Sequence, residues 1–142
     1  MKTLLYSVIL VAIMYSISDS NLHAQNRKLS LVKIEWEDLD TETVYDVSCD
    51  SFRSLFATTI KNKSFNDSLN LSNFNQLIKC FKMERGYKAI DVRGIITFYY
   101  KQTKVEYCFD KFGHFYKDGV LTINKKLMSF ITKNQYPRRF AP

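Results

Sequence analysis

The pattern of apolar and polar positions predicts a hairpin near the start of the folded part of the chain. From Lys28 to Trp36, apolar side chains at Val32, Ile34 and Trp36 fall two positions apart, the period of a strand with one buried side. The polar segment 37–40 predicts a turn. The segment 43–48 predicts a second strand, because Val and Tyr favour β structure; its β-forming residues are Val44, Tyr45 and Val47.

Three segments carry side chains at helical spacing, and each follows a residue that suits the N-cap of a helix. The N-caps and the positions on their helix faces are Asp50 with Phe52, Leu55, Phe56 and Thr59; Ser72 with Phe74, Leu77, Ile78 and Phe81; and Asn124 with Leu127, Phe130 and Ile131. Gly86 suits the end of the second helix, because glycine adopts the left-handed conformation that often terminates helices. The Asn- and Ser-rich segment 61–75 predicts a loop.

Residues 92–123 give the clearest strand signals. Segments 93–101 and 104–110 form strands around a turn at residues 102–103, and the paired side chains share one face. The pairs are Tyr100 with Val105, Phe98 with Tyr107, and Ile96 with Phe109. Gly113 suits the next turn, and Asp118-Gly119 is the strongest hairpin signal in the chain. The non-alternating order of strands and helices predicts an α+β fold: an antiparallel sheet with a C-terminal β-meander and about three helices packed on one face.

The start of the chain has the three parts of a secretory signal peptide. Lys2 supplies a positive charge, residues 4–17 are almost all apolar, and Leu22-His23-Ala24 offers a small residue before a cleavage site. The apolar run is shorter than the roughly 20 residues that a membrane-spanning helix needs. We therefore expect a signal peptide over residues 1–24, a single α+β domain over 25–142, a periplasmic or secreted location, and no stable membrane anchor.

Charge is distributed unevenly along the expected mature chain. Residues 25–50 hold three basic and seven acidic groups, whereas residues 51–142 hold seventeen basic and six acidic groups. One interpretation is a solvated surface on which one hairpin happens to be acidic. The other is a basic face for an acidic protein partner, because a surface field attracts partners of the opposite charge.

The metal-ligating residue types do not occur at the spacing of a known site. Cys49, Cys80 and Cys108 lack the close pairs of a zinc site, and Asp38-x-Asp40-x-Glu42 lacks the glycine of a calcium loop. We therefore predict no metal and no cofactor. An oxidising compartment permits one disulfide among the three cysteines, although all three could equally be buried thiols, and the sequence does not select a pair.

Candidate functional residues are few. His114 is the only histidine after residue 24, and no nucleophile motif accompanies it, so we interpret it as an exposed turn residue and predict no catalytic residue. Tyr99 and Tyr116 alternate away from the apolar face, and with Lys101 and Lys104 they predict a partner-binding surface. The alternative is that a helix covers that face. Aromatic and basic side chains also stack on nucleic acids, but no recognition motif supports nucleic-acid binding here.

Two classes of function remain open on this basis. The first is a secreted or periplasmic, non-enzymatic binding or inhibitor protein, for example an immunity protein against a toxin that acts in the periplasm. The second is a small periplasmic hydrolase that uses His114 with a carboxylate. The sequence leaves the partner and the oligomeric state open.

Overall fold

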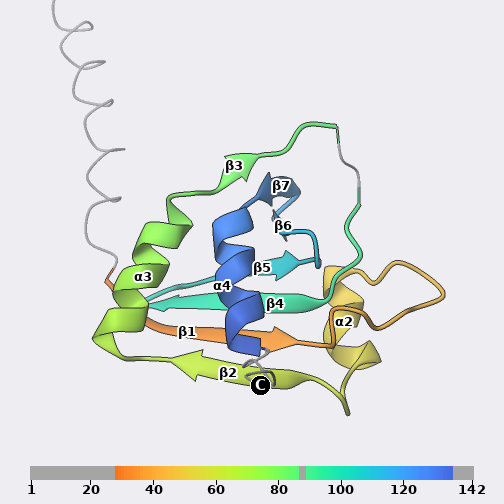
Figure 1. Ribbon diagram of the computed structural model, residues 1–142, viewed down its shortest axis with the longest axis horizontal. Helices are drawn as coiled ribbons and strands as arrows, with labels where there is room; N and C mark the ends of the chain where they lie inside the picture. The colour runs from red at the N-terminus through yellow and green to blue at the C-terminus, as the bar shows by residue number, and fades with distance from the viewer. Residues whose placement is uncertain (1–27, 87–88, 136–142) are drawn as a thin grey trace, which may run out of the picture.

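The computed structural model describes residues 28–86 and 89–135, so the predicted signal peptide and its cleavage site lie outside the described residues. Within this part of the chain, seven strands form one antiparallel sheet in the order β2-β1-β4-β5-β6-β7-β3, and three helices pack against it (Figure 1). The predicted α+β class is confirmed. The elements are β1 (Leu29–Trp36), α2 (Cys49–Leu55), β2 (Lys61–Phe65), α3 (Ser68–Ile78), β3 (Lys82–Met83), β4 (Gly94–Tyr100), β5 (Lys104–Phe109), β6 (His114–Lys117), β7 (Val120–Ile123) and α4 (Lys125–Gln135).

The main core lies between the sheet and the helices α3 and α4, which cover the same face (Figure 1). Alternate residues of the central strands supply one side of this core, because side chains two positions apart point to the same face. The buried side chains from the strands are Leu29, Val32, Ile34, Trp36, Phe65, Ile96, Phe98, Phe109 and Phe115, and those from the helices are Phe74, Leu127, Met128 and Ile131. Of the six residues predicted to be buried together, Phe98, Phe109, Leu127 and Ile131 are buried in this core, whereas Tyr107 and Phe130 are half-buried against it.

The helix α2 lies against the opposite face, at the end of the sheet where β1 stops and β4 begins. Ile95 of β4 pairs with Cys108 of β5, and both point away from the main core. Phe52 of α2 and Phe56, the residue that caps its C-terminus, pack with these two residues in a second, smaller buried cluster. The two faces are therefore covered differently, because α2 reaches only one end of the face on which it lies.

The predicted strand over residues 43–48 is wrong, because this segment is a loop. Both edges of β1 are already occupied, one by β2 and the other by β4, so no neighbouring strand position is left for it. Val44 and Tyr45 are 89% and 83% exposed. Only Val47 turns inward, and it joins the cluster beneath α2.

The predicted loop over residues 61–75 is also wrong, because it contains the edge strand β2 and most of α3. Residues 61–65 pair with β1, and Phe65 is the only buried side chain in the strand. The strand is polar because it lies at the edge of the sheet, where charged side chains such as Lys61 and Lys63 discourage pairing with another chain. Its composition therefore resembles that of a loop.

Two helices begin at residues other than the predicted ones. Ser48, not Asp50, is the N-cap of α2: its hydroxyl accepts from the Ser51 amide, and the Ser51 hydroxyl accepts from the Ser48 amide. Asp67, not Ser72, is the N-cap of α3. In both helices the true cap satisfies an amide of the first turn that would otherwise have no partner.

The predicted start of α4 is confirmed. Asn124 accepts from the Leu127 amide at 3.0 Å and donates to the Leu77 carbonyl at 2.8 Å, so one side chain caps α4 and attaches it to the end of α3. The helix α3 ends at Ile78, well before the stop predicted at Gly86. Gly86 lies instead in the connection that follows β3, with a φ of +88°.

The C-terminal meander is confirmed as β4-β5-β6-β7. Phe98 pairs with Val105 rather than Tyr107, so the register is shifted by two residues from the predicted one. A shift of two keeps every side chain on its predicted face. Asp118 and Gly119 both have positive φ, as a two-residue hairpin requires, and Gly113 has a φ of +84°.

Candidate functional site

Three of the four predicted partner-binding residues lie together at one end of the sheet. Tyr99 of β4 pairs with Lys104 of β5, and Lys101 lies in the turn that joins these strands. Leu31 of β1 pairs with Tyr99 on its other side, and Lys28 immediately precedes β1 at the same end. We call the surface formed by Lys28, Leu31, Tyr99, Lys101 and Lys104 the basic end.

Leu31, Tyr99 and Lys104 lie on the sheet face opposite α3 and α4, beyond the end covered by α2, while Lys28 and Lys101 lie just outside the strands at the same end. The side chains of Leu31 and Tyr99 are half-buried, and the three lysines are exposed. None of these lysines forms an ion pair within residues 28–86 and 89–135. The surface therefore combines the half-buried Leu31 and Tyr99 with exposed cationic groups, of which Lys104 also interacts electrostatically with Glu106.

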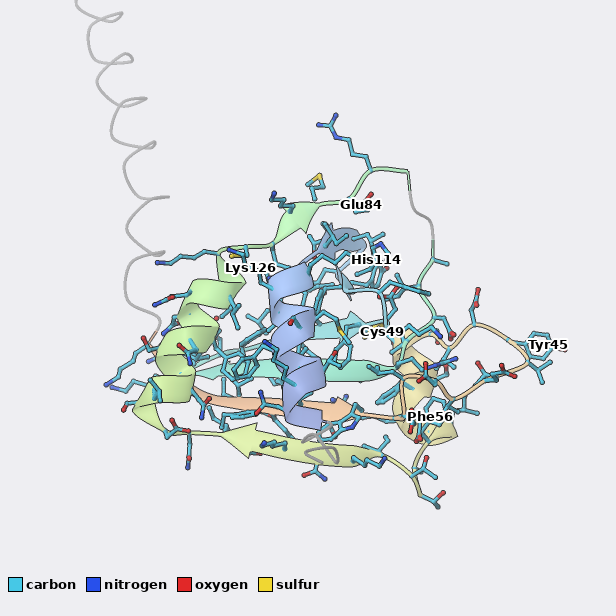
Figure 2. The ribbon with its side chains drawn as sticks, viewed as in Figure 1. Tyr45, Cys49, Phe56, Glu84, His114 and Lys126 are labelled. Carbon is cyan, nitrogen blue, oxygen red and sulfur yellow. A yellow bond between two sulfur atoms is a disulfide. The ribbon has the colours of Figure 1, made fainter. Side chains whose placement is uncertain are left out.

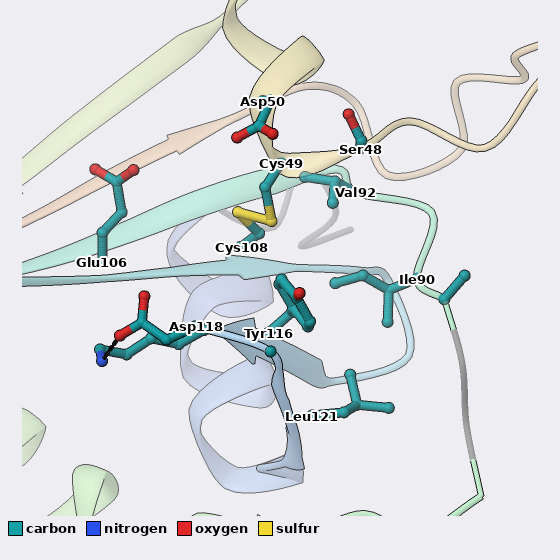
Figure 3. Close-up of a pocket in the computed structure, with 13 residues that line it drawn as sticks. Ser48, Cys49, Asp50, Ile90, Val92, Glu106, Cys108, Tyr116, Asp118 and Leu121 are labelled. Carbon is teal, nitrogen blue, oxygen red and sulfur yellow. Dashed lines mark hydrogen bonds and ion pairs between the residues drawn. A yellow bond between two sulfur atoms is a disulfide. The ribbon is translucent and has the colours of Figure 1, made fainter.

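The fourth predicted residue, Tyr116, does not belong to the basic end. It pairs with Cys108, four residues further along β5 than Lys104, which is about 13 Å at the usual strand rise. Glu106 separates the two positions on the same face. Tyr116 instead lines a pocket of about 600 Å³ between the start of α2 and the β6-β7 hairpin (Figure 3).

This pocket has apolar walls and an acidic rim. Figure 3 shows the Tyr116 ring between the disulfide and the side chains of Ile90 and Leu121. The carboxylates among the lining residues are Asp50, Glu106 and Asp118, and the one cation, Lys117, is ion-paired with Asp118. Because Glu106 is paired with Arg53 and Lys117 with Asp118, the pocket adds no unpaired cation to the surface predicted for an acidic partner.

A disulfide joins Cys49 at the start of α2 to Cys108 of β5, with a Cα–Cα distance of 5.8 Å. It fastens the first turn of the helix to the sheet beside the pocket (Figure 3). Cys80 is a half-buried free thiol. The sequence could not select this pairing, because the two residues are 59 positions apart and meet only when α2 folds onto the sheet.

Arg53 attaches the other end of α2 to the sheet. Its guanidinium bonds Glu35 of β1 at 2.7 Å and Glu106 of β5 at 2.9 Å, and Lys33 bonds Glu35 at 3.0 Å. The Arg53 hydrogen bond lowers the pKa of Glu106 against the opposing effect of burial. Burial opposes ionisation of Glu35 as well, but the bonds from Arg53 and Lys33 outweigh it and lower its pKa. Sequence reasoning missed this network, which lies between the pocket and the basic end.

Residues 38–48, which we call the acidic loop, are anchored by the buried side chain of Arg93. Its guanidinium donates to both oxygens of Asp91 and to the Thr43 hydroxyl at 3.0 Å. Asp91 also accepts from the Val47 amide at 2.9 Å, and the Val92 amide donates to the Val47 carbonyl. Both legs of the loop are therefore fixed by hydrogen bonds to one segment of chain.

The tip of the acidic loop projects from the molecule, and Figure 2 shows Tyr45 at its outermost point. Val44 and Tyr45 are the two most exposed large hydrophobic side chains in the described part of the protein. Glu42 and Asp46 flank them and are also exposed. The sequence had predicted a turn over residues 37–40 and a strand over 43–48, and it gave no sign that Val44 and Tyr45 would stand exposed at the tip of a loop.

His114 is not the exposed turn residue that the sequence predicted. It begins β6, its side chain is 17% exposed, and its Nδ1 lies 2.7 Å from the carboxylate of Asp110. The other Asp110 oxygen accepts from the amides of Phe112 and His114. The prediction failed because the Gly113 turn folds the chain back, so that a carboxylate four residues earlier reaches the imidazole.

The carboxylates of Asp38, Asp40 and Glu42, whose spacing lacks the glycine of a calcium loop, lie in the acidic loop. Asp38 accepts from the Asp40 amide at 3.1 Å, and Asp40 faces Lys111 at 3.7 Å. Within residues 28–86 and 89–135, no three His, Cys, Asp or Glu side chains are grouped so that they could hold a metal ion. These contacts give the acidic side chains of the loop a local structural role.

The comparisons with protein-family models, with curated proteins and with solved structures all find no match for this chain. Among the described helices, none has the length and apolar character needed to span a membrane. Arguments about function therefore depend on the chain's own residues and on where the fold places them.

Proposed function

We propose that this protein is an exported, non-enzymatic binding protein whose acidic protein partner contacts the basic end. The observation that carries the proposal is the grouping of the exposed Lys28, Lys101 and Lys104 at the same end of the sheet as the half-buried Tyr99. Aromatic residues are frequent anchors of protein interfaces, and surrounding charges guide the encounter and select the partner.

The compartment is supported by two independent features. The N-terminal segment has the pattern of a signal peptide, and the Cys49–Cys108 disulfide belongs to the chemistry of oxidising compartments. A small exported binding protein of this kind suits the role of an immunity protein that neutralises a toxin acting in the periplasm. In that role, its expression should protect a susceptible cell only when the signal peptide is present.

Affinity capture tests the binding proposal. The protein purified from its host serves as bait for periplasmic extract at low and at high salt, beside a Lys101→Glu/Lys104→Glu variant. A Lys61→Glu/Lys126→Glu variant is the matched control, since it makes the same charge change at exposed positions outside the basic end. An acidic partner should be retained by the wild type and the control at low salt and lost from the Lys101/Lys104 variant. Retention of the same partner by all three proteins, independent of salt, would remove the basis of the proposal.

A second candidate function is a small hydrolase, and the bond between His114 and Asp110 favours it, because a carboxylate that orients an imidazole is a recurring part of hydrolytic sites. The same carboxylate, however, holds two backbone amides of the 110–114 turn, which assigns it a structural task. We expect His114→Ala to leave the biological activity within a few-fold of wild type. Loss of activity with an unchanged circular dichroism spectrum would favour the hydrolase instead.

A further inference from the structure

The acidic loop and the basic end lie at opposite ends of the sheet. β1 starts beside the basic end and leads into the acidic loop. The antiparallel β4 begins at the end of the sheet near the acidic loop and runs back toward Tyr99 (Figure 1). The eight residues of β1 span about 26 Å at the usual strand rise. The acidic loop and the basic end are therefore separated by about the length of β1.

The two surfaces complement each other in charge and in polarity. The tip of the acidic loop presents the apolar pair Val44 and Tyr45 between the carboxylates of Glu42 and Asp46. The basic end presents half-buried Leu31 and Tyr99 inside a rim of lysines. An apolar projection with a negative surround therefore matches an apolar patch with a positive surround, as complementary interfaces require.

We propose that the acidic loop of one copy docks on the basic end of a second copy, so that the protein associates head to tail. This inference rests on the proposed function, because it assigns to the basic end an acidic surface, the acidic loop of another molecule of this net-positive chain. Val44 and Tyr45 cover Leu31 and Tyr99 of the second copy, while the flanking carboxylates face its lysines. A docked pair still has the basic end of one copy and the acidic loop of the other copy unoccupied. Further copies can bind at both, so the association extends as an open chain.

The anchoring of the loop makes such docking favourable. Arg93 and Asp91 hold both legs of the loop, so binding does not have to order the backbone around the tip. The contact is nevertheless small, below the roughly 1,200 Å² that a stable interface buries, so association should be weak and should depend on protein concentration. Two copies of this net-positive chain repel each other over long distances, but salt at physiological ionic strength screens this repulsion beyond about 8 Å. The opposite charges of the loop and the basic end lie closer than that when docked, so their attraction is screened less.

Sedimentation velocity of the protein purified from its host tests the inference, with circular dichroism to verify the fold of every variant. The wild type at about 0.15 M salt should sediment faster as its concentration rises, and at about 1 M salt, where the Debye length is about 3 Å, it should sediment as a monomer. Two charge reversals are compared, Glu42→Lys/Asp46→Lys in the loop and Lys101→Glu/Lys104→Glu at the basic end. Each alone should remain monomeric, whereas a mixture of the two should associate, because every contact between the two variants then joins opposite charges. The Lys61→Glu/Lys126→Glu control should associate like the wild type.

A wild type that stays monomeric at every concentration at 0.15 M salt would overturn the inference. So would two reversal variants that associate like the wild type, or a mixture that does not associate. These outcomes are distinguishable from failure of the proposed function. If the wild type is monomeric but a separate acidic protein binds it and not the Lys101/Lys104 variant, only the head-to-tail contact is refuted.

Discussion

Replacement of the Cys49–Cys108 disulfide should cost a large part of the stability of the fold. A bond between residues 59 positions apart removes loop-closure entropy from the unfolded chain, and the chain-entropy relation gives about 4 kcal/mol for a loop of this length. We therefore expect Cys49→Ser/Cys108→Ser to lower the free energy of unfolding by about 4 kcal/mol. For a domain of this size, that corresponds to a fall of roughly 16 °C in Tm.

Urea unfolding followed by tryptophan fluorescence measures this change, because the chain has a single tryptophan, Trp36, which is buried. Cys80→Ser is the matched control. It makes the same chemical change at a half-buried thiol that closes no loop, so its stability should stay within about 1 kcal/mol of wild type. Intact-mass analysis of the exported protein should show the loss of two hydrogens. A double variant as stable as wild type, or a control that is destabilised equally, would refute the pairing.

Two further predictions concern the attachment of α2. The pKa values of Glu35 and Glu106 are lowered in the folded state, so their bonds to Arg53 stabilise the protein fully above the unfolded pKa near 4.5, and this stabilisation is lost as the pH falls through the lower folded pKa values. Glu106→Gln should therefore flatten the decline in the urea-melt free energy of unfolding below pH 4.5. A variant with the same pH profile as the wild type would contradict the network. Phe52→Ala should lower the free energy of unfolding by about 3–5 kcal/mol, because this side chain is fully buried. Leu55→Ala, on the exposed side of the same helix, should lower it by less than about 1 kcal/mol. Equal losses for the two variants in thermal melts would contradict the packing of α2 through Phe52.

The parts of the fold that sequence predicted were those with strong local signals. Asp118-Gly119 predicts a hairpin locally, because both residues readily adopt the positive φ that the turn requires. Asn124 caps α4 by accepting from the amide three residues later, which is also a local contact. The edge strand β2 was missed because few of its side chains are buried, so they carry no apolar alternation. Val44 and Tyr45 were misassigned for the opposite reason: they have strand-forming side chains but no free strand beside them.

The site was predicted in part. Alternation correctly placed Tyr99 and Tyr116 on the same face, but it says nothing of distance along a strand, and the register separates them by four residues of β5. The contacts of Arg53 and Arg93 join segments far apart in the chain, and long-range ion pairs leave no pattern in sequence. The bond between Asp110 and His114 is local, and the Gly113 turn signal could have indicated it.

The most direct test of the account is photocrosslinking in the living host, with p-benzoylphenylalanine in place of Tyr99 at the centre of the basic end. Leu69 on α3, which is 71% exposed, is the control position. We predict a crosslinked adduct from position 99 with an acidic protein or with a second copy of the chain, little adduct from position 69, and loss of the adduct on Lys101→Glu/Lys104→Glu. Equal adducts from both positions, no adduct from position 99, or an adduct with a basic protein of another sequence would contradict the claim that the basic end binds an acidic partner.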